Sequence, residues 1–218
     1  VVGFTPGGAA DFTARTTAVE LSKVLGQTVV VENKPGAGSS LAAEYVSRGT
    51  PDGYTILIAS PSSILVNPVM KPELKHNVSN LVPITKVSSA PLIMAVTPTA
   101  GINSVADLVS AAKKAPGKLN YGSSGSGSAP HLGMVYFSSV AGIEMQHIPF
   151  KGGSQATQSV ISGRVEVYFG TPPSTLPFVK AGRLKGLAVS TPQRSPYAAD
   201  LPGMAELGYP DFNYSFWY

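Results

Sequence analysis

The chain has 218 residues, of which 43% are hydrophobic and 13% charged, and it contains no cysteine. The apolar fraction supplies enough material for a core, so the 23 glycines and 19 prolines do not signal disorder. The lack of cysteine excludes disulfides, thiolate metal sites and a cysteine nucleophile. The net charge of +4 is modest and the basic residues are scattered singly, which argues against nucleic-acid binding. There is no apolar run long enough to span a membrane.

Short apolar segments alternate with helix-like segments in the first half of the chain. Strands are predicted at residues 1–4, 28–31, 54–59 and 91–96. A first helix is predicted after the break at residues 5–8, because apolar residues recur at helical spacing from Ala14 to Leu25 and Gly26 provides a stop. A second helix is predicted near residues 41–47. Residues 61–83 contain four prolines and are predicted to be irregular.

A second series of elements begins at Ser104, which opens a helix that Pro116-Gly117 ends. Further strands are predicted at residues 119–121, 144–150, 165–169 and 184–189, and further helices near 131–140, 155–162 and 176–181. Gly163 and Gly182 follow the last two helices, where a left-handed cap favours glycine. The alternation predicts an α/β fold with largely parallel sheets. The irregular middle and the restart near residue 100 indicate two α/β lobes.

The loops after the predicted strands are the candidate binding sites, because ligands of open α/β sheets bind at the carboxyl ends of strands. Five such loops are rich in glycine and hydroxyl groups and poor in charge: residues 5–11, 60–63, 122–128, 151–154 and 170–174. Backbone N–H groups at helix starts, together with serine hydroxyls, form a neutral anion site. The pattern therefore predicts a bound carboxylate. Ordinary caps and turns need the same residues, so a purely structural role stays open.

Motifs for other functions fail on inspection. Gly125-x-Gly127 is followed by Pro130 where a dinucleotide loop needs its third glycine, and there is no phosphate-binding P-loop. Residues 122–126 miss the G-x-S-x-G pattern of serine hydrolases by ending in serine. An esterase that uses Ser124 or Ser126 with His131 is the alternative function. The three histidines lack the spacing of metal ligands, so we expect no metal and no cofactor.

Asp11 lies near the third helical position after Gly8, and we interpret it first as a capping carboxylate that pairs with Arg15 one turn onward. Contact with an ammonium group of the ligand is the alternative. We interpret His131 as a hydrogen-bonding residue at a helix start that lines the cleft. Four aromatic residues on predicted strands are assigned to the core: Tyr54, Phe150, Tyr168 and Phe169.

The ordered set of loop motifs resembles the Bug-type extracytoplasmic solute receptors of tripartite tricarboxylate transporters. It comprises P-G-G at residues 6–8 followed by Asp11 and Ala14-Arg15, and then residues 25–38, 51–55, 116–121, 131–132, 148–153 and 180–189. The resemblance implies a two-lobed, type II periplasmic binding protein of Venus flytrap architecture, each lobe a mostly parallel sheet flanked by helices. It implies hinge closure on a small mono- or dicarboxylate, aromatic acid or amino acid, delivery to permease subunits in the membrane, and no enzymatic activity. The expected protein is a periplasmic monomer, although the chain contains no signal-peptide pattern.

The resemblance places a ligand carboxylate between the first loop and a loop of the second lobe. The complete set of predicted ligand-binding residues is Gly7, Gly8, Ala9, Asp11, Ser60, Ser62, Ser123, Ser124, Gly125, Ser126, His131, Gly152, Gly170 and Thr171. Lobe one is assigned to residues 1–98 with a returning segment at 214–218, and lobe two to residues 99–213. Two positions depart from the family pattern: Gly170 stands where aspartate is frequent, and Ser39 follows the P-G-A-G loop where glycine is usual. Family members also continue beyond Tyr218 with a part that completes lobe one.

Overall fold

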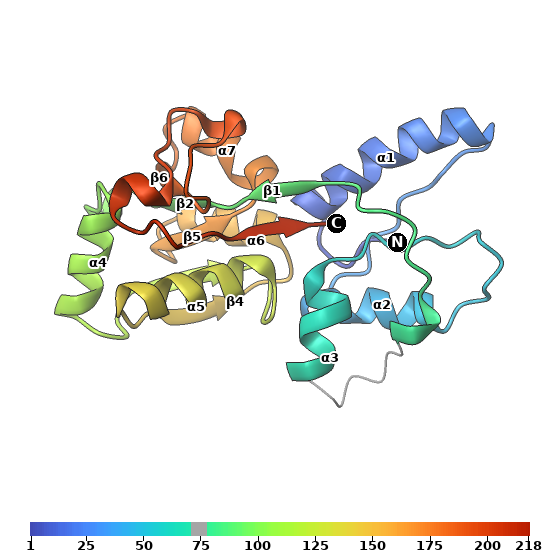
Figure 1. Cartoon of the computed structure of the whole chain (residues 1–218), viewed down its shortest axis with the longest axis horizontal. Coiled ribbons are helices and arrows are strands. Elements are labelled where there is room, and N and C mark those ends of the chain that lie inside the picture. Colours follow the sequence, from blue (N-terminus) through green and yellow to red (C-terminus); the bar gives the residue numbers. More distant parts are fainter. Residues whose placement is uncertain (71–77) are drawn as a thin grey trace.

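The computed structural model describes residues 1–70 and 78–218, which form two lobes side by side (Figure 1). The helices of the first lobe are α1 (Ala9–Leu25), α2 (Ser40–Ser47) and α3 (Asn67–Met70). Those of the second are α4 (Val105–Lys114), α5 (Ala129–Ala141), α6 (Gly153–Ile161) and α7 (Pro172–Lys180). Its strands are β2 (Ile93–Val96), β3 (Asn120–Ser123), β4 (Gln146–Pro149), β5 (Val167–Gly170) and β6 (Lys185–Val189). No helix in the described ranges is long and apolar enough to cross a membrane.

The second lobe is built on one five-stranded sheet with the order β4-β3-β5-β2-β6. Strand β3 is parallel to β4 and β5, but β2 is antiparallel to both β5 and β6. Strands β3, β4, β5 and β6 therefore point the same way, so the sheet is mostly parallel, with β2 as its one antiparallel strand. Strand β2 enters directly from an extended segment instead of through a crossover helix, so nothing constrains it to the direction of its neighbours. The predicted helices and strands of this lobe are present, with ends shifted by a few residues.

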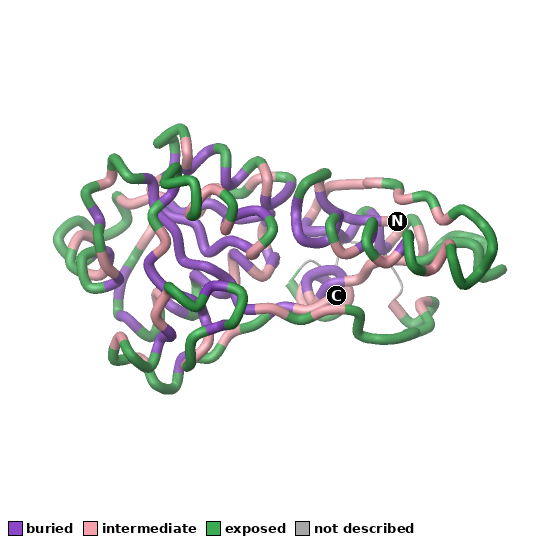
Figure 2. The backbone as a smooth tube through the Cα atoms, turned by 90° about the horizontal axis from the view of Figure 1, so that it is seen from above, coloured by how far each residue is buried: buried purple, intermediate pink, exposed green. Residues whose placement is uncertain are grey.

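Two apolar layers cover the sheet, because side chains alternate along each strand. On one face, Phe169 of β5 packs with Leu108 of α4 and Phe137 of α5 in the main core. On the other face, Tyr168 packs with Val160 of α6 and with residues of α7. Figure 2 shows the result as a dense buried interior in this lobe and a thinner one in the other. Tyr168 and Phe169 are thus core residues, as predicted.

The first lobe has no comparable sheet among its described residues. Val2 forms isolated parallel bridges to Asn33 and Ile58, and the strands predicted at residues 28–31 and 54–59 do not form. Tyr54 is 93% exposed, so its assignment to the core is wrong. Most of the large exposed apolar side chains of the chain also lie here. An apolar segment becomes a strand only when a neighbour pairs with it, which its own composition cannot reveal.

A helix occupies residues 61–70, where the prolines predicted irregular structure. Its first part, Ser62–Val66, is π-helical, and the N–H of Asn67 donates to the carbonyl of Ser62. Proline is tolerated in the first turn of a helix, where Pro61 lies. The π-helical turn that follows is wider than an α-helical turn and is a known irregularity within α-helices. The remainder of the predicted irregular stretch includes residues 71–77, and therefore His76, which lie outside the described residues.

Two antiparallel strands, β1 (Ser89–Pro91) and β7 (Ser215–Trp217), run between the lobes (Figure 1). The ladder continues past β7, since the Val87 N–H donates to the Tyr218 carbonyl at 2.8 Å. Strand β2 follows β1 directly and pairs inside the second lobe, although the predicted division assigns it to lobe one. The division at residues 98/99 stays a prediction, and the β1–β7 ladder is the segment that we propose as the hinge.

Candidate ligand-binding site between the lobes

The loop that begins α1 is fixed from within by the carboxylate of Asp11. The Gly7 N–H donates to Asp11 Oδ2 at 3.0 Å, and Arg15 pairs with both oxygens of the carboxylate. Asn33 Nδ2 donates to Asp11 Oδ1 and to the Phe4 carbonyl. Burial alone would raise the pKa of Asp11, but the hydrogen bonds from Arg15, Gly7 and Asn33 outweigh it and hold this pKa below its ordinary value. Asp11 thus shapes the loop, and the pair with Arg15 expected from the spacing is present.

Asp11→Ala is expected to lower the free energy of unfolding by roughly 2–3 kcal/mol at neutral pH, because Gly7, Arg15 and Asn33 all lose a buried, charged acceptor. A lowered folded-state pKa means that this stabilisation is complete above the ordinary aspartate pKa of about 3.9 and is lost as the pH falls through the folded value. Urea unfolding at neutral pH and near pH 2 measures both effects. Glu20→Ala is the control, since its ion pair on the same helix is exposed and should change stability by less than about 0.5 kcal/mol. Equal stability of the two variants would contradict the role of Asp11.

The start of α1 meets the start of α6 across the lobes. Thr5 Oγ1 lies 3.2 Å from Ser154 Oγ, which donates to the Pro6 carbonyl at 3.0 Å. A Cβ atom added to Gly8 would lie 3.9 Å from the backbone nitrogen of Gly153. The predicted residues Gly7 and Gly8 therefore come together with the loop that contains Gly152. Sequence reasoning found both loops but did not select Thr5 or Ser154.

A second contact between the lobes joins residues 36–39 to residues 124–127. A Cβ atom on Gly38 would lie 2.7 Å from the Ser126 carbonyl oxygen, and one on Gly127 would lie only 2.4 Å from Asn67 Oδ1. Asn67 is fully buried, and its Nδ2 donates to the carbonyls of Ala37 and Gly38 at 3.0 Å. Asn67 was missed by the sequence reasoning, because it lies in the stretch whose prolines predicted irregular structure.

A hollow of about 460 Å³ opens beside this second contact and is lined from both lobes. Its lining residues are Gly36, Ala37, Gly38, Ser124, Gly125, Ser126, Pro149, Phe150, Lys151 and Gln155. Of the predicted site residues, it contains Ser124, Gly125 and Ser126. Lys151 is the one charged residue in this lining, and it is exposed.

Four helices begin at the loops of this junction without a hydrogen bond from the side chain of the N-cap residue. The N-cap residues are Gly8 of α1, Ser128 of α5, Gly152 of α6 and Thr171 of α7. Helix α7 also contacts α1 and α6. The first N–H groups of a helix have no partner within it, and the helix dipole adds positive potential at that end. The junction therefore favours an anion without needing a cationic side chain.

Five buried side-chain polar atoms lack a hydrogen-bond partner among the described residues. They are Ser39 Oγ, Ser60 Oγ, Asn67 Oδ1, Ser128 Oγ and Tyr168 Oη. Buried polar groups are normally satisfied, so these atoms suit bound water or a polar ligand. Ser60 was a predicted site residue. Ser62, also predicted, is buried in the first turn of the following helix, and its Oγ is not among these five atoms.

Gly170 and Thr171 lie at the start of α7. A Cβ atom on Gly170 would be 2.0 Å from Thr175 Oγ1 and 2.4 Å from the Tyr168 ring, so no side chain fits there in this arrangement. Thr171 Oγ1 is 2.9 Å from Ser174 Oγ and both are buried. Glycine stands here where the family often has aspartate, and the Thr175 and Tyr168 side chains occupy the space that an aspartate side chain would need.

The serine that contacts a histidine here is Ser123, whose Oγ lies 2.6 Å from His147 Nε2. Ser123 is fully buried and its Oγ also accepts the Gly125 N–H at 3.0 Å. His131 Nδ1 accepts the Gly127 N–H at 3.1 Å. These bonds fix the loop and do not present an exposed nucleophile, which gives the predicted esterase pairing no support. In residues 1–70 and 78–218 there is also no cluster of three or more potential metal ligands.

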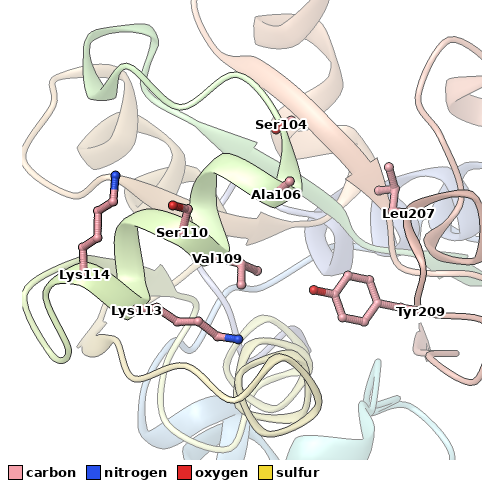
Figure 3. A pocket seen from close by; sticks show the side chains of 8 residues that line it. All are labelled: Ser104, Ala106, Val109, Ser110, Lys113, Lys114, Leu207 and Tyr209. Atoms are coloured by element: carbon pink, nitrogen blue, oxygen red, sulfur yellow. The ribbon is translucent and has the colours of Figure 1, made fainter.

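A second hollow, of about 580 Å³, lies on the second lobe between α4 and residues 207–209 (Figure 3). Figure 3 shows Val109 and Tyr209 lining it, with Lys113 and Lys114 extending in different directions. It shares no lining residue with the junction of the lobes. None of the predicted site residues lines it.

Two lobes joined by extended strands are the architecture of the class of periplasmic solute-binding proteins. Within it, the chain belongs to the tripartite tricarboxylate transporter family of receptors, whose pattern matches residues 13–218. It is 34% identical to the protein BugT of Bordetella pertussis over 220 residues, which cover 100% of this chain and 68% of BugT. The Bug-type resemblance is thereby confirmed.

Two solved structures share the fold closely. Rpa4515 of R. palustris with adipate has 33% sequence identity and a TM-score of 0.95, covering 99% of this chain and 73% of that one. MatC of Rhodopseudomonas palustris with bound malate has 25% identity and a TM-score of 0.92, covering 99% and 74%. The chain spans about two thirds of the length of the curated relatives that it matches, 64% for one at 36% identity.

Proposed function

We propose that this chain binds a small carboxylate between its lobes and, as part of a periplasmic receptor, closes on it and delivers it to a tripartite tricarboxylate-type permease. The observation that carries the proposal is the meeting of two helix starts, α1 and α6, across the junction. Neither start has a side-chain cap, and both direct positive dipole ends toward the same place. A carboxylate satisfies donors of both lobes at once, so it stabilises the closed arrangement.

Dicarboxylates are the first ligands to test. Two relatives of known structure hold adipate and malate, and both of these ligands carry two carboxylates. In this chain, the hollow at the second contact offers backbone and hydroxyl donors together with Lys151. A ligand with two anionic ends could therefore use the helix starts at one end and this hollow at the other.

Adipate or malate is expected to raise the melting temperature of the purified chain, since a ligand at 100 times its Kd adds about 2.7 kcal/mol to the free energy of unfolding. Adipamide, which has the shape of adipate without its charge, is the control and should have no effect. A thermal-shift screen of mono- and dicarboxylates, aromatic acids and amino acids, followed by calorimetry, measures this. No stabilisation by any carboxylate, or equal stabilisation by adipamide, would refute the proposal. Ester hydrolysis that disappears in His131→Ala would instead favour the esterase.

A further inference from the structure

Three aromatic rings are stacked beneath the loop at residues 122–128, and two of them are histidines. His131, on α5, and His147, on β4, have ring centroids 4.1 Å apart. The Tyr121 ring stacks on the His147 ring at 5.0 Å. The rings come from three elements that surround the loop: β3 before it, α5 after it and β4 beside β3. This loop supplies one wall of the hollow between the lobes.

Both histidines hold the loop through ring nitrogens. The Gly127 N–H donates to His131 Nδ1 at 3.1 Å, and a backbone N–H can only donate, so Nδ1 carries no proton. Ser123 Oγ accepts the Gly125 N–H and lies 2.6 Å from His147 Nε2, so its hydroxyl can donate to that nitrogen when the His147 proton is on Nδ1. The two rings thus fix the backbone at Gly125 and Gly127 from below. Both glycines have positive φ, 117° and 79°, a backbone conformation that glycine adopts readily.

The surroundings disfavour positive charge on the His147 ring. Burial, and then the neighbouring His131, lower the pKa of His147 to about 4. Helix α5 carries no Asp, Glu, Lys or Arg, and Tyr121 is the titratable group stacked on the pair from β3. Glu166, immediately before β5, is engaged by another residue: its carboxylate accepts from the backbone N–H and from the side-chain Nδ2 of Asn120. Lys151, which is exposed and lines the same hollow, adds positive charge to this wall of the site.

We propose that His131 and His147 are positioning residues that, as neutral hydrogen-bond acceptors, hold residues 123–127 in the form that binds ligand. This inference rests on the proposed function, because it assigns a role to the wall of that site. Protonation of His131 at Nδ1 would turn an acceptor into a donor facing the Gly127 N–H, and charge on both rings at 4.1 Å would be mutually unfavourable. Acidification should therefore release the loop.

The tautomers can be measured on the full chain without ligand by ¹⁵N NMR of the imidazole rings. We expect neutral rings at pH 7, with the proton of His131 on Nε2 and that of His147 on Nδ1. The amide protons of Gly125 and Gly127 should exchange slowly at pH 7 and lose protection as the rings titrate. A protonated Nδ1 in His131, or unprotected exchange at both glycines, would overturn the proposal. Because these readouts need no ligand, they separate its failure from a failure of the proposed function.

Variants test the link to binding, with adipate as the probe and calorimetry as the measurement. His131→Leu and His147→Leu remove the acceptors and should weaken adipate binding by about 10–100-fold at pH 7. His131→Asn and His147→Gln supply a hydrogen-bond acceptor whose amide group is not protonated on acidification. Binding of adipate should therefore recover to within about threefold of wild type and lose its acid sensitivity. Tyr136→Phe, at an exposed position of the same helix α5, is the control and should leave adipate affinity unchanged. Equal loss in the leucine and amide variants would mean that the rings act through packing alone, and would overturn the proposal.

Discussion

Gly152→Ala is expected to abolish ligand-induced stabilisation and to weaken ligand binding by more than about 100-fold, equivalent to about 2.7 kcal/mol. The backbone of Gly152 is extended, with φ of 179°, so alanine is allowed there by the backbone itself. Its Cβ atom, however, would lie 1.9 Å from Thr5 Oγ1 and 2.9 Å from the Thr5 nitrogen, across the junction of the lobes. The methyl group would therefore separate the starts of α1 and α6 while leaving the second lobe intact.

Two measurements separate a loss of ligand binding from a loss of folding. Calorimetry with adipate measures the affinity, and urea unfolding without ligand measures the stability. Gly182→Ala is the matched control: it places the same methyl group where no atom lies within 4 Å, so it costs about 1 kcal/mol for its left-handed backbone and leaves affinity unchanged. Thr5→Gly in the Gly152→Ala background should restore part of the binding. Wild-type affinity in Gly152→Ala would show that the lobes do not meet at Thr5 when ligand is bound.

Outside residues 61–70, the positions of the longer helices could be predicted from the sequence because their signals are local. Gly163 and Gly182 follow α6 and α7 with φ of 71° and 68°, as the left-handed caps required. Ser104 accepts the N–H of Asp107 at the start of α4, as its spacing indicated. Each of these interactions lies within a few residues along the chain. The sequence therefore contains all that is needed to place them.

The arrangement of strands could not be predicted in the same way. The direction of β2 depends on how the chain enters the second lobe, and its apolar residues fit parallel and antiparallel neighbours equally. In the first lobe, Val30 is 80% exposed although its segment has the composition of a buried strand. Pairing partners are distant in sequence, so composition alone gives too many strands.

The candidate site was half predictable for the same reason. The glycine and serine loops lie at strand ends, and this placed Gly8 and Ser126 at the junction. Which residues of the opposite lobe they meet depends on how the two lobes are placed against each other, so Thr5, Ser154 and Asn67 carried no signal of their own. The direct contacts of Asn67, with the carbonyls of Ala37 and Gly38, lie about thirty residues away along the chain.

Asn67→Leu is expected to lower the free energy of unfolding by roughly 3 kcal/mol and to weaken binding of adipate by about 100-fold, because one amide holds a strained wall of the hollow. Ala37 in that wall and Ser39 next to it are non-glycine residues with positive φ, of 47° and 76°. Such conformations cost about 1–3 kcal/mol each and persist only where surrounding bonds impose them. Asn67 Nδ2 donates to the Ala37 and Gly38 carbonyls and, at 2.8 Å, to Ser40 Oγ. Without these bonds the turn relaxes and the wall moves.

A double-mutant cycle with Ser39→Gly distinguishes imposed strain from simple loss of hydrogen bonds. In the wild-type background, glycine at position 39 relieves the left-handed backbone and removes a buried hydroxyl without a partner, so it should stabilise by about 1 kcal/mol. In the Asn67→Leu background the turn has already relaxed, and most of that gain should disappear. Urea unfolding of the four proteins gives the coupling, expected to exceed about 0.5 kcal/mol. If Ser39→Gly stabilises both backgrounds equally, the coupling energy between positions 39 and 67 is zero. Residues other than Asn67 would then impose the strain.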